Sequence, residues 1–143
     1  MTEVAFHFNA PDKLAYVCRL ARKALRHRTQ LVVLGSPPLL KALSPRLWSV
    51  SPTDFLAHAG EGDGADIMAF SPIVLLERLD GAPHHDMLVN LGGEVPEGFE
   101  RFARVVEVVS ATDDEDRHLA RQRWKHYAAQ GISIKRHDLV LKE

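Results

Sequence analysis

Apolar residues are grouped along this chain in short blocks, and their spacing predicts an alternation of strands and helices. Compact apolar runs typical of strands occupy residues 4–8, 31–35, 73–77, 87–91 and 104–109. Residues 132–141 alternate only weakly, which is compatible with either a last strand or an extended tail.

Between the first two apolar runs, residues 11–27 carry apolar side chains at helical spacing. The stripe expected to be buried consists of Leu14, Val17, Cys18, Ala21 and Leu25. The opposite face is basic and consists of Lys13, Arg19, Arg22, Lys23 and Arg26. Strand, helix and strand in this order predict a βαβ unit with a right-handed crossover.

The middle of the chain gives weaker signals. A short helix is expected at residues 38–43, and Pro45 is expected to interrupt the chain before the next motif. Residues 51–70 are expected to be mostly loop, and residues 98–103 to form one or two helical turns. The alternation as a whole predicts a single three-layer α/β domain over residues 1–143, with a mostly parallel central sheet that resembles a mononucleotide-binding fold.

The longest helix is expected between Thr112 and Gly131. Thr112 is a suitable N-cap with Glu115 three residues on, the spacing of a capping box, and acidic residues crowd the first turn. Gly131 supplies the flexible residue that is typical just past a helix end. The apolar stripe of this helix consists of Leu119, Ala120, Trp124, Tyr127 and Ala128.

Cationic side chains border this stripe. Arg117 and Arg121 are one turn apart on the side of Trp124, and Lys125 continues the row. Two guanidinium groups beside a large aromatic ring suit a carboxylate attached to an apolar side chain, because the arginines fork onto the acid while the ring covers the apolar part. The alternative is a core tryptophan next to a solvated cationic face.

The composition is that of an ordinary globular protein, with 45% hydrophobic and 26% charged residues. No apolar run approaches the length of a membrane span and no signal peptide is recognisable, so no membrane contact and a cytoplasmic location are expected. The net charge of −1 conceals three blocks: residues 1–48 carry eight Lys/Arg and two Asp/Glu, residues 49–116 three and fifteen, and residues 117–143 seven and two. Such segregation predicts separate surfaces for different partners.

No catalytic constellation is recognisable in the sequence. The turn NAPDK after the first strand lacks the glycines and the lysine of a phosphate-binding loop, and the glycine-rich residues 60–64 are too acidic for that role. His84, His85 and Asp86 form a tight cluster, but adjacent residues rarely chelate one ion together, so neither a metal nor a cofactor is expected. The single cysteine, Cys18, lies within a helix pattern without an activating group, and an enzymatic function is therefore not supported.

An ordered set of short motifs resembles the chi subunit family of bacterial DNA polymerase III. In chain order, the motifs are RLW (46–48), DFLAHAGEG (54–62), PIVLL (72–76), LVNLGGEVP (88–96), FARVVEVV (102–109) and LARQRWKHYAAQGISI (119–134). Their order and spacing carry the resemblance, which covers nearly the whole chain. The resemblance implies a non-catalytic adaptor in the clamp-loader assembly that joins the polymerase holoenzyme to single-stranded DNA-binding protein and contacts DNA only indirectly.

The resemblance also implies a binding pocket. In the family, the acidic, phenylalanine-terminated tail of single-stranded DNA-binding protein is held by the tryptophan of the LW motif and by basic and aromatic residues of the last long helix. On this sequence these positions are Trp48, Arg117, Arg121 and Trp124, with Lys125 alongside. We therefore expect Trp48 and Trp124 to lie near each other and to be partly buried. The aromatic residue of RQRW is more often tyrosine in the family, so Trp124 is expected to change the shape of the pocket.

A second surface implied by the resemblance pairs with the psi subunit of the clamp loader and centres on an FLPH-like segment. In this chain the segment consists of Phe55, Leu56, Ala57 and His58, with alanine in place of the familiar proline. Because psi is not evident in every lineage that has chi, the surface serves either psi or another protein, for example a repair helicase.

A second hypothesis is a nucleotide- or nucleic-acid-binding α/β protein that uses the basic face of the first helix. That face lacks interleaved aromatic residues, which favours a solvated surface. The two hypotheses differ in ligand, because an acidic, phenylalanine-terminated peptide should bind to the adaptor whereas single-stranded DNA alone should bind to it poorly.

Overall fold

The computed structural model describes residues 2–48 and 58–139. A seven-stranded sheet runs through them in the order β3-β4-β2-β5-β6-β1-β7, and all neighbouring strands are parallel. The strands are β1 (Glu3–Ala10), β2 (Leu31–Leu34), β3 (Ala59–Gly60), β4 (Ile73–Leu76), β5 (Met87–Asn90), β6 (Arg104–Ser110) and β7 (Ile134–Asp138). The α/β class with a parallel central sheet, expected from the sequence, is confirmed.

Helices cover both faces of this sheet. They are α1 (Lys13–Arg26), α2 (Pro37–Trp48), α3 (Ala65–Phe70) and α4 (Asp114–Ala129), with 3-10 turns at Glu61–Asp63, Leu79–Gly81 and Phe99–Arg101. Val17 of α1 and Leu47 of α2 belong to one buried cluster. Ala120 and Tyr127 of α4 belong to a second cluster on the other face, so the sheet is the middle layer of three. None of the helices in the described residues is both long and apolar enough to cross a membrane.

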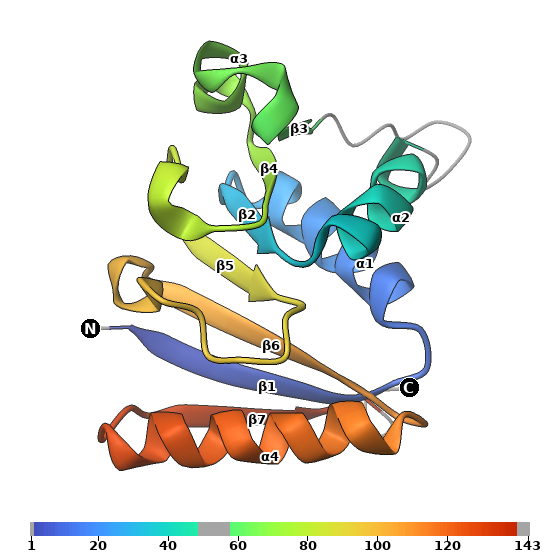
Figure 1. Cartoon of the computed structure of the whole chain (residues 1–143), viewed down its shortest axis with the longest axis vertical. Coiled ribbons are helices and arrows are strands. Elements are labelled where there is room, and N and C mark those ends of the chain that lie inside the picture. The colour runs from blue at the N-terminus through green and yellow to red at the C-terminus, as the bar shows by residue number, and fades with distance from the viewer. Residues whose placement is uncertain (1, 49–57, 140–143) are drawn as a thin grey trace.

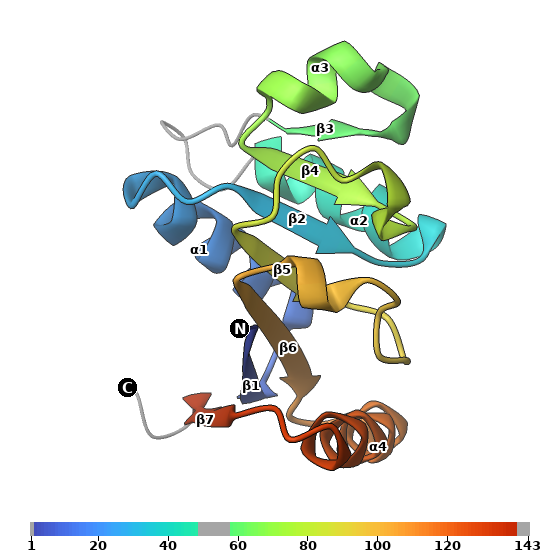
Figure 2. The same cartoon turned by 90° about the vertical axis from the view of Figure 1, so that its left-hand side faces the viewer.

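The strand order places the two edges of the sheet, and the helices beside them, at opposite ends of the molecule. Figures 1 and 2 show β3, β4 and α3 at one end and β1, β7 and α4 at the other. Helix α2 lies toward the first end, and its buried side chains pack on the face of the sheet opposite α4. Any site built on α2 is therefore distant from any site built on α4.

Helix α4 begins one residue later than the capping-box pattern predicts. Asp113, and not Thr112, is the N-cap, since its side chain accepts a hydrogen bond from the backbone N–H of Asp116 at 3.2 Å. The N–H of Thr112 donates instead to Ser110 Oγ at 3.1 Å, which keeps this residue in the preceding turn. At the other end, Gly131 has a φ of +74°, as expected for the residue just past a helix.

Two expectations for the middle of the chain are wrong. Helix α2 continues through Pro45, because Leu43 and Leu47 on either side of it are fully buried in one cluster and hold the turn despite the missing N–H. The segment expected to be mostly loop contains β3 and α3 in its described part, residues 58–70, whereas residues 51–57 lie outside the described residues. β3 pairs in parallel with the edge of β4, and a contact between strands that are separated in the sequence cannot be predicted from local sequence patterns.

The C-terminal segment left open by the sequence is a strand. β7 pairs with β1 in parallel, with Arg136 opposite Phe6 and Asp138 opposite Phe8. Helix α4 is thus the crossover between β6 and β7, and it covers the β1 strand between them (Figure 1).

Candidate functional site

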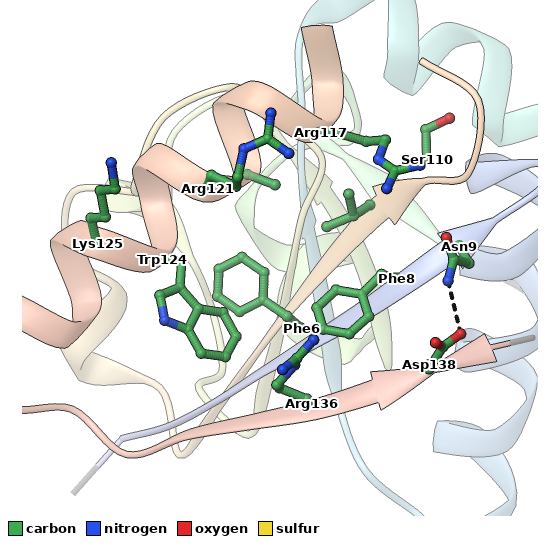
Figure 3. Close-up of a pocket in the computed structure, with 12 residues that line it drawn as sticks. Phe6, Phe8, Asn9, Ser110, Arg117, Arg121, Trp124, Lys125, Arg136 and Asp138 are labelled. Atoms are coloured by element: carbon green, nitrogen blue, oxygen red, sulfur yellow. Dashed lines mark hydrogen bonds between the residues drawn. The ribbon is translucent and has the colours of Figure 1, made fainter. Parts of the chain in front are cut away.

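A pocket of about 560 Å³ opens between α4, β1 and β7, and Figure 3 shows its lining side chains. Its floor is apolar. The alternation of β1 turns Phe6 and Phe8 toward α4, and Val109 of β6 and Ala120 of α4 complete the floor. Ala120 is small, which leaves space between the helix and the sheet. Ala128, expected on the apolar stripe, is exposed and does not line the pocket.

Trp124 forms the aromatic wall of the pocket. Its indole is half-buried and lies 5.0 Å from the ring of Phe6, measured between centroids. Across the pocket, the guanidinium carbon of Arg136 lies 5.1 Å from the Phe8 centroid and 5.9 Å from the Trp124 centroid. Aromatic rings and a stacked guanidinium therefore surround the space above the floor.

A row of cations follows α4 along one rim. Arg117, Arg121 and Lys125 are exposed at successive turns, and all three line the pocket beside Trp124 (Figure 3). Within the described residues, neither Arg121 nor Lys125 has a carboxylate within ion-pairing distance. Their charges are therefore available to an anionic ligand.

Arg117 is held by the backbone. Its Nη1 donates a hydrogen bond to the carbonyl oxygen of Ala111 at 3.1 Å. Asp116 in the acidic first turn of α4 is engaged elsewhere, because it forms an ion pair with Lys13 at 2.8 Å and accepts a hydrogen bond from the backbone N–H of Ser110. Arg117 can still present its remaining N–H groups to the pocket.

The end of the pocket nearest Arg117 is polar. Asp138 on β7 accepts a hydrogen bond from Asn9 Nδ2 at 2.8 Å, and Ser110 lies close by at the end of β6. The lining thus carries four cations and one carboxylate around an apolar floor. This arrangement suits an anionic ligand with an apolar group, since the floor can bury the apolar part while guanidinium groups fork onto carboxylates.

A buried polar network fixes α4 on the sheet. Arg123 Nε donates to Glu107 Oε1 at 2.9 Å, and Tyr127 Oη donates to Oε2 at 2.7 Å. The Asn90 amide donates to both carboxylate oxygens, and Arg123 Nη1 reaches the carbonyl oxygen of Gly93. Arg123 is 2% exposed and Glu107 is fully buried. Two turns of α4 are thereby tied to β6, which sets the position of the cationic rim.

The protonation states of this network follow from its burial. Burial raises the pKa of the Glu107 carboxyl, and the adjacent Arg123 guanidinium opposes that shift. Burial and the neighbouring Glu107 carboxylate raise the pKa of Tyr127 far above its usual value. The Tyr127 hydroxyl therefore stays protonated at neutral pH and can donate its hydrogen bond to Glu107.

Trp48 lies at a different site, so the expected proximity of Trp48 and Trp124 is wrong. Trp48 ends α2, on the opposite face of the sheet from α4 and toward the β3 end. It is 45% exposed, and its ring centroid lies 4.7 Å from that of His58. The LW motif identifies Trp48 as a candidate binding residue, but the surface on which Trp48 lies depends on the strand order, which the motif does not predict.

Trp48 and His58 line a second pocket of about 470 Å³ beside α2 and β3. His58 Nε2 lies 2.6 Å from Ser44 Oγ, which ties the last residue of the FLPH-like segment to α2. Phe55 and Leu56 lie outside the described residues. The structure thus brings Trp48 together with one member of the expected partner-binding segment.

Several residues of the candidate site were not predicted from the sequence. Phe6 and Phe8 carry a period-two signal along the first strand, but the helix that covers them is not apparent from that signal. Arg136 shares a face with Ile134 by the same alternation, although its place in the pocket depends on the β1–β7 pairing. Arg123 lies between Ala120 and Tyr127 on the apolar stripe of α4. It was not predicted to be buried because it is charged.

Comparison with known proteins gives consistent matches. The family model described as DNA polymerase III chi subunit, HolC, matches residues 1–135 of the chain. The DNA polymerase III subunit chi of Haemophilus influenzae is 26% identical over 118 residues, which cover 82% of this chain and 81% of that protein.

Proposed function

This chain belongs to the DNA polymerase III chi subunit family, and from this premise we propose that its α4 pocket captures the acidic C-terminal tail of single-stranded DNA-binding protein. Chi subunits are non-catalytic accessory subunits of the polymerase, so the chain acts in DNA replication through binding. A non-catalytic subunit acts through surfaces of defined chemistry rather than through a reactive centre.

One observation carries the proposal: an apolar floor lies directly beside a row of cations on α4, of which Arg121 and Lys125 have no ion-pair partner among the described residues. A C-terminal phenylalanine offers an aromatic ring and an α-carboxylate on the same residue. The ring fits over Phe6 and Phe8 beside Trp124. The rings of Phe6 and Trp124 already lie 5.0 Å apart, a centroid distance at which aromatic pairs are favourable, and a further ring can pack against them. The α-carboxylate then lies within reach of the α4 arginines, and acidic residues before it meet the remaining cations.

Isothermal titration with a short synthetic peptide tests this function. The peptide carries aspartates followed by a C-terminal phenylalanine, and we expect saturable one-to-one binding that weakens as salt is added. Two control peptides remove one feature each, namely the free carboxylate by C-terminal amidation and the ring by replacing phenylalanine with alanine. Both controls should bind much more weakly, and equal binding of all three peptides would contradict the proposal.

We also propose that the surface around Trp48 and His58 binds psi or another protein, for example a repair helicase. Trp48 is a large apolar side chain at 45% exposure beside a pocket, a pattern typical of contact sites. This surface and the α4 pocket lie on opposite faces of the sheet, so both partners can be bound at once.

A nucleic-acid-binding role for α1 is the second candidate. Arg19, Lys23 and Arg26 are exposed along that helix, as the basic pattern predicts. The same titration with single-stranded DNA separates the two functions, since the adaptor should bind the peptide and leave the oligonucleotide largely free.

A further inference from the structure

We propose that Arg136 on β7 is a specificity-determining residue that makes the α4 pocket select a tail with acidic side chains on both sides of its chain. The inference rests on the proposed tail-binding function and assigns a second cationic wall to the same pocket. The segment matched by the family model ends at residue 135, so this arginine lies just beyond it.

The guanidinium of Arg136 is presented to the pocket by the aromatic floor. It lies 5.1 Å from the Phe8 centroid and 5.9 Å from the Trp124 centroid, within the range of cation–π contact. A guanidinium stacked in this way keeps its N–H groups at its edges, where they can still fork onto a carboxylate. The rings therefore orient the group without using its hydrogen-bond donors.

Arg136 is the cation of the β7 wall. The side chain is exposed and has no carboxylate within ion-pairing distance in the part of the chain that the structure describes. Lys135 is no substitute, because strand alternation turns it to the other face, where it pairs with Glu3 at 3.1 Å. Asp138, on the same face as Arg136, repels acids from the far end of this wall.

Cations on both walls constrain the ligand. Arg117 and Arg121 approach from α4, whereas Arg136 approaches from β7, with Phe6 and Phe8 between them (Figure 3). In an extended peptide, successive side chains point to opposite sides. Two adjacent acids before the apolar terminus therefore reach opposite walls, one toward Arg117 and the other toward Arg136.

The test is a double-mutant cycle between protein and peptide. Arg136→Gln is titrated with a peptide that has two adjacent aspartates before a C-terminal phenylalanine, and with two peptides in which one or the other aspartate is asparagine. We expect Arg136→Gln to weaken the doubly acidic peptide by about three- to ten-fold, the effect of losing one charged contact at a partly exposed site. The loss should vanish for one of the asparagine peptides, and Arg117→Gln should couple to the other.

Two variants separate recognition from general charge. Lys135→Gln removes the same charge from the opposite face and should change peptide affinity by less than about two-fold. Arg136→Lys keeps the charge but loses the planar fork, and should lie between the wild type and Arg136→Gln.

Several results would overturn the inference. Three results would each show that Arg136 does not contact an acidic side chain of the peptide, while tail binding itself would stand. These are an unchanged peptide affinity in Arg136→Gln, an equal loss of affinity for all three peptides in that variant, and an equal loss of affinity in Lys135→Gln. A wild-type protein that binds none of the peptides would instead refute the tail-binding function, and this inference with it.

Discussion

Arg121 occupies the middle of the cationic row, across the apolar floor from Arg136 (Figure 3). Because hydrogen bonds to charged groups contribute ~1.5–3 kcal/mol, Arg121→Ala should weaken binding of the acidic peptide by about ten-fold or more. Arg117→Ala should have a smaller effect, since Arg117 already donates to the carbonyl of Ala111. Titration calorimetry measures both losses.

The salt dependence of peptide binding by the same two variants provides a further check. Added salt should weaken the wild type more than the arginine variants, because the variants have fewer charges to screen. A folded Arg121→Ala protein that binds the peptide with unchanged affinity would mean that this face of α4 is only solvated, the alternative that its sequence allows.

Local spacing explains which pocket residues could be predicted. Arg117, Arg121, Trp124 and Lys125 lie within two or three turns of one helix, so their shared side follows from the helical period alone. The opposite wall depends on contacts such as that of Asn9 with Asp138, which are 129 residues apart. No local pattern reports that pairing, and Arg136 was therefore not foreseen.

At the level of elements, α4 owes its position to a buried ion pair. Arg123→Ala would leave Glu107 in the core without its cation, and removal of one partner of a buried pair typically costs ~3–5 kcal/mol. We expect a loss of unfolding free energy of about this size in urea denaturation followed by circular dichroism.

Arg121→Ala is a matched control for this measurement, because it removes the same side chain from an exposed position two residues away on α4. Its unfolding free energy should stay within about 0.5 kcal/mol of the wild type. Equal stability losses in the two variants, or a loss below about 1 kcal/mol for Arg123→Ala, would contradict the anchoring role of the network.

Element boundaries show the same division between local and distant causes. The start and end of α4 were predicted to within one residue, because capping acids and Gly131 act locally. The length of α2 was not, since the burial of Leu47 beyond Pro45 is a tertiary effect. The parallel α/β class followed from the alternation of strand and helix patterns, whereas the strand order did not.

For the whole molecule, that strand order separates the two proposed binding surfaces. The chi family resemblance supplied the residue types, but it did not reveal that Trp48 and Trp124 lie on opposite faces of the sheet. The structure instead groups Trp48 with His58, the last residue of the segment that contains Phe55. The proposed functions together make the chain a two-sided adaptor, with the proposed tail pocket on α4 and the proposed partner surface near α2.

Separate surfaces predict separable mutants. Phe55→Ala should abolish pull-down of the clamp-loader-side partner while leaving peptide affinity and the melting temperature unchanged, because a residue that contacts a partner contributes to binding rather than to folding. Arg121→Ala should show the reverse pattern. Retention of the partner at wild-type strength by Phe55→Ala would remove Phe55 from the surface, and early melting would identify it as a core residue.

The central claim, that the acidic tail binds beside α4 and not beside α2, can be read from the two tryptophans of the chain. Their indole N–H groups give two signals in a ¹H–¹⁵N spectrum, which Trp48→Phe and Trp124→Phe variants assign. On titration with the phenylalanine-terminated acidic peptide, we expect the Trp124 signal to move to saturation while the Trp48 signal stays in place. Movement of the Trp48 signal with a stationary Trp124 signal would place the tail on the other face of the sheet and contradict the account.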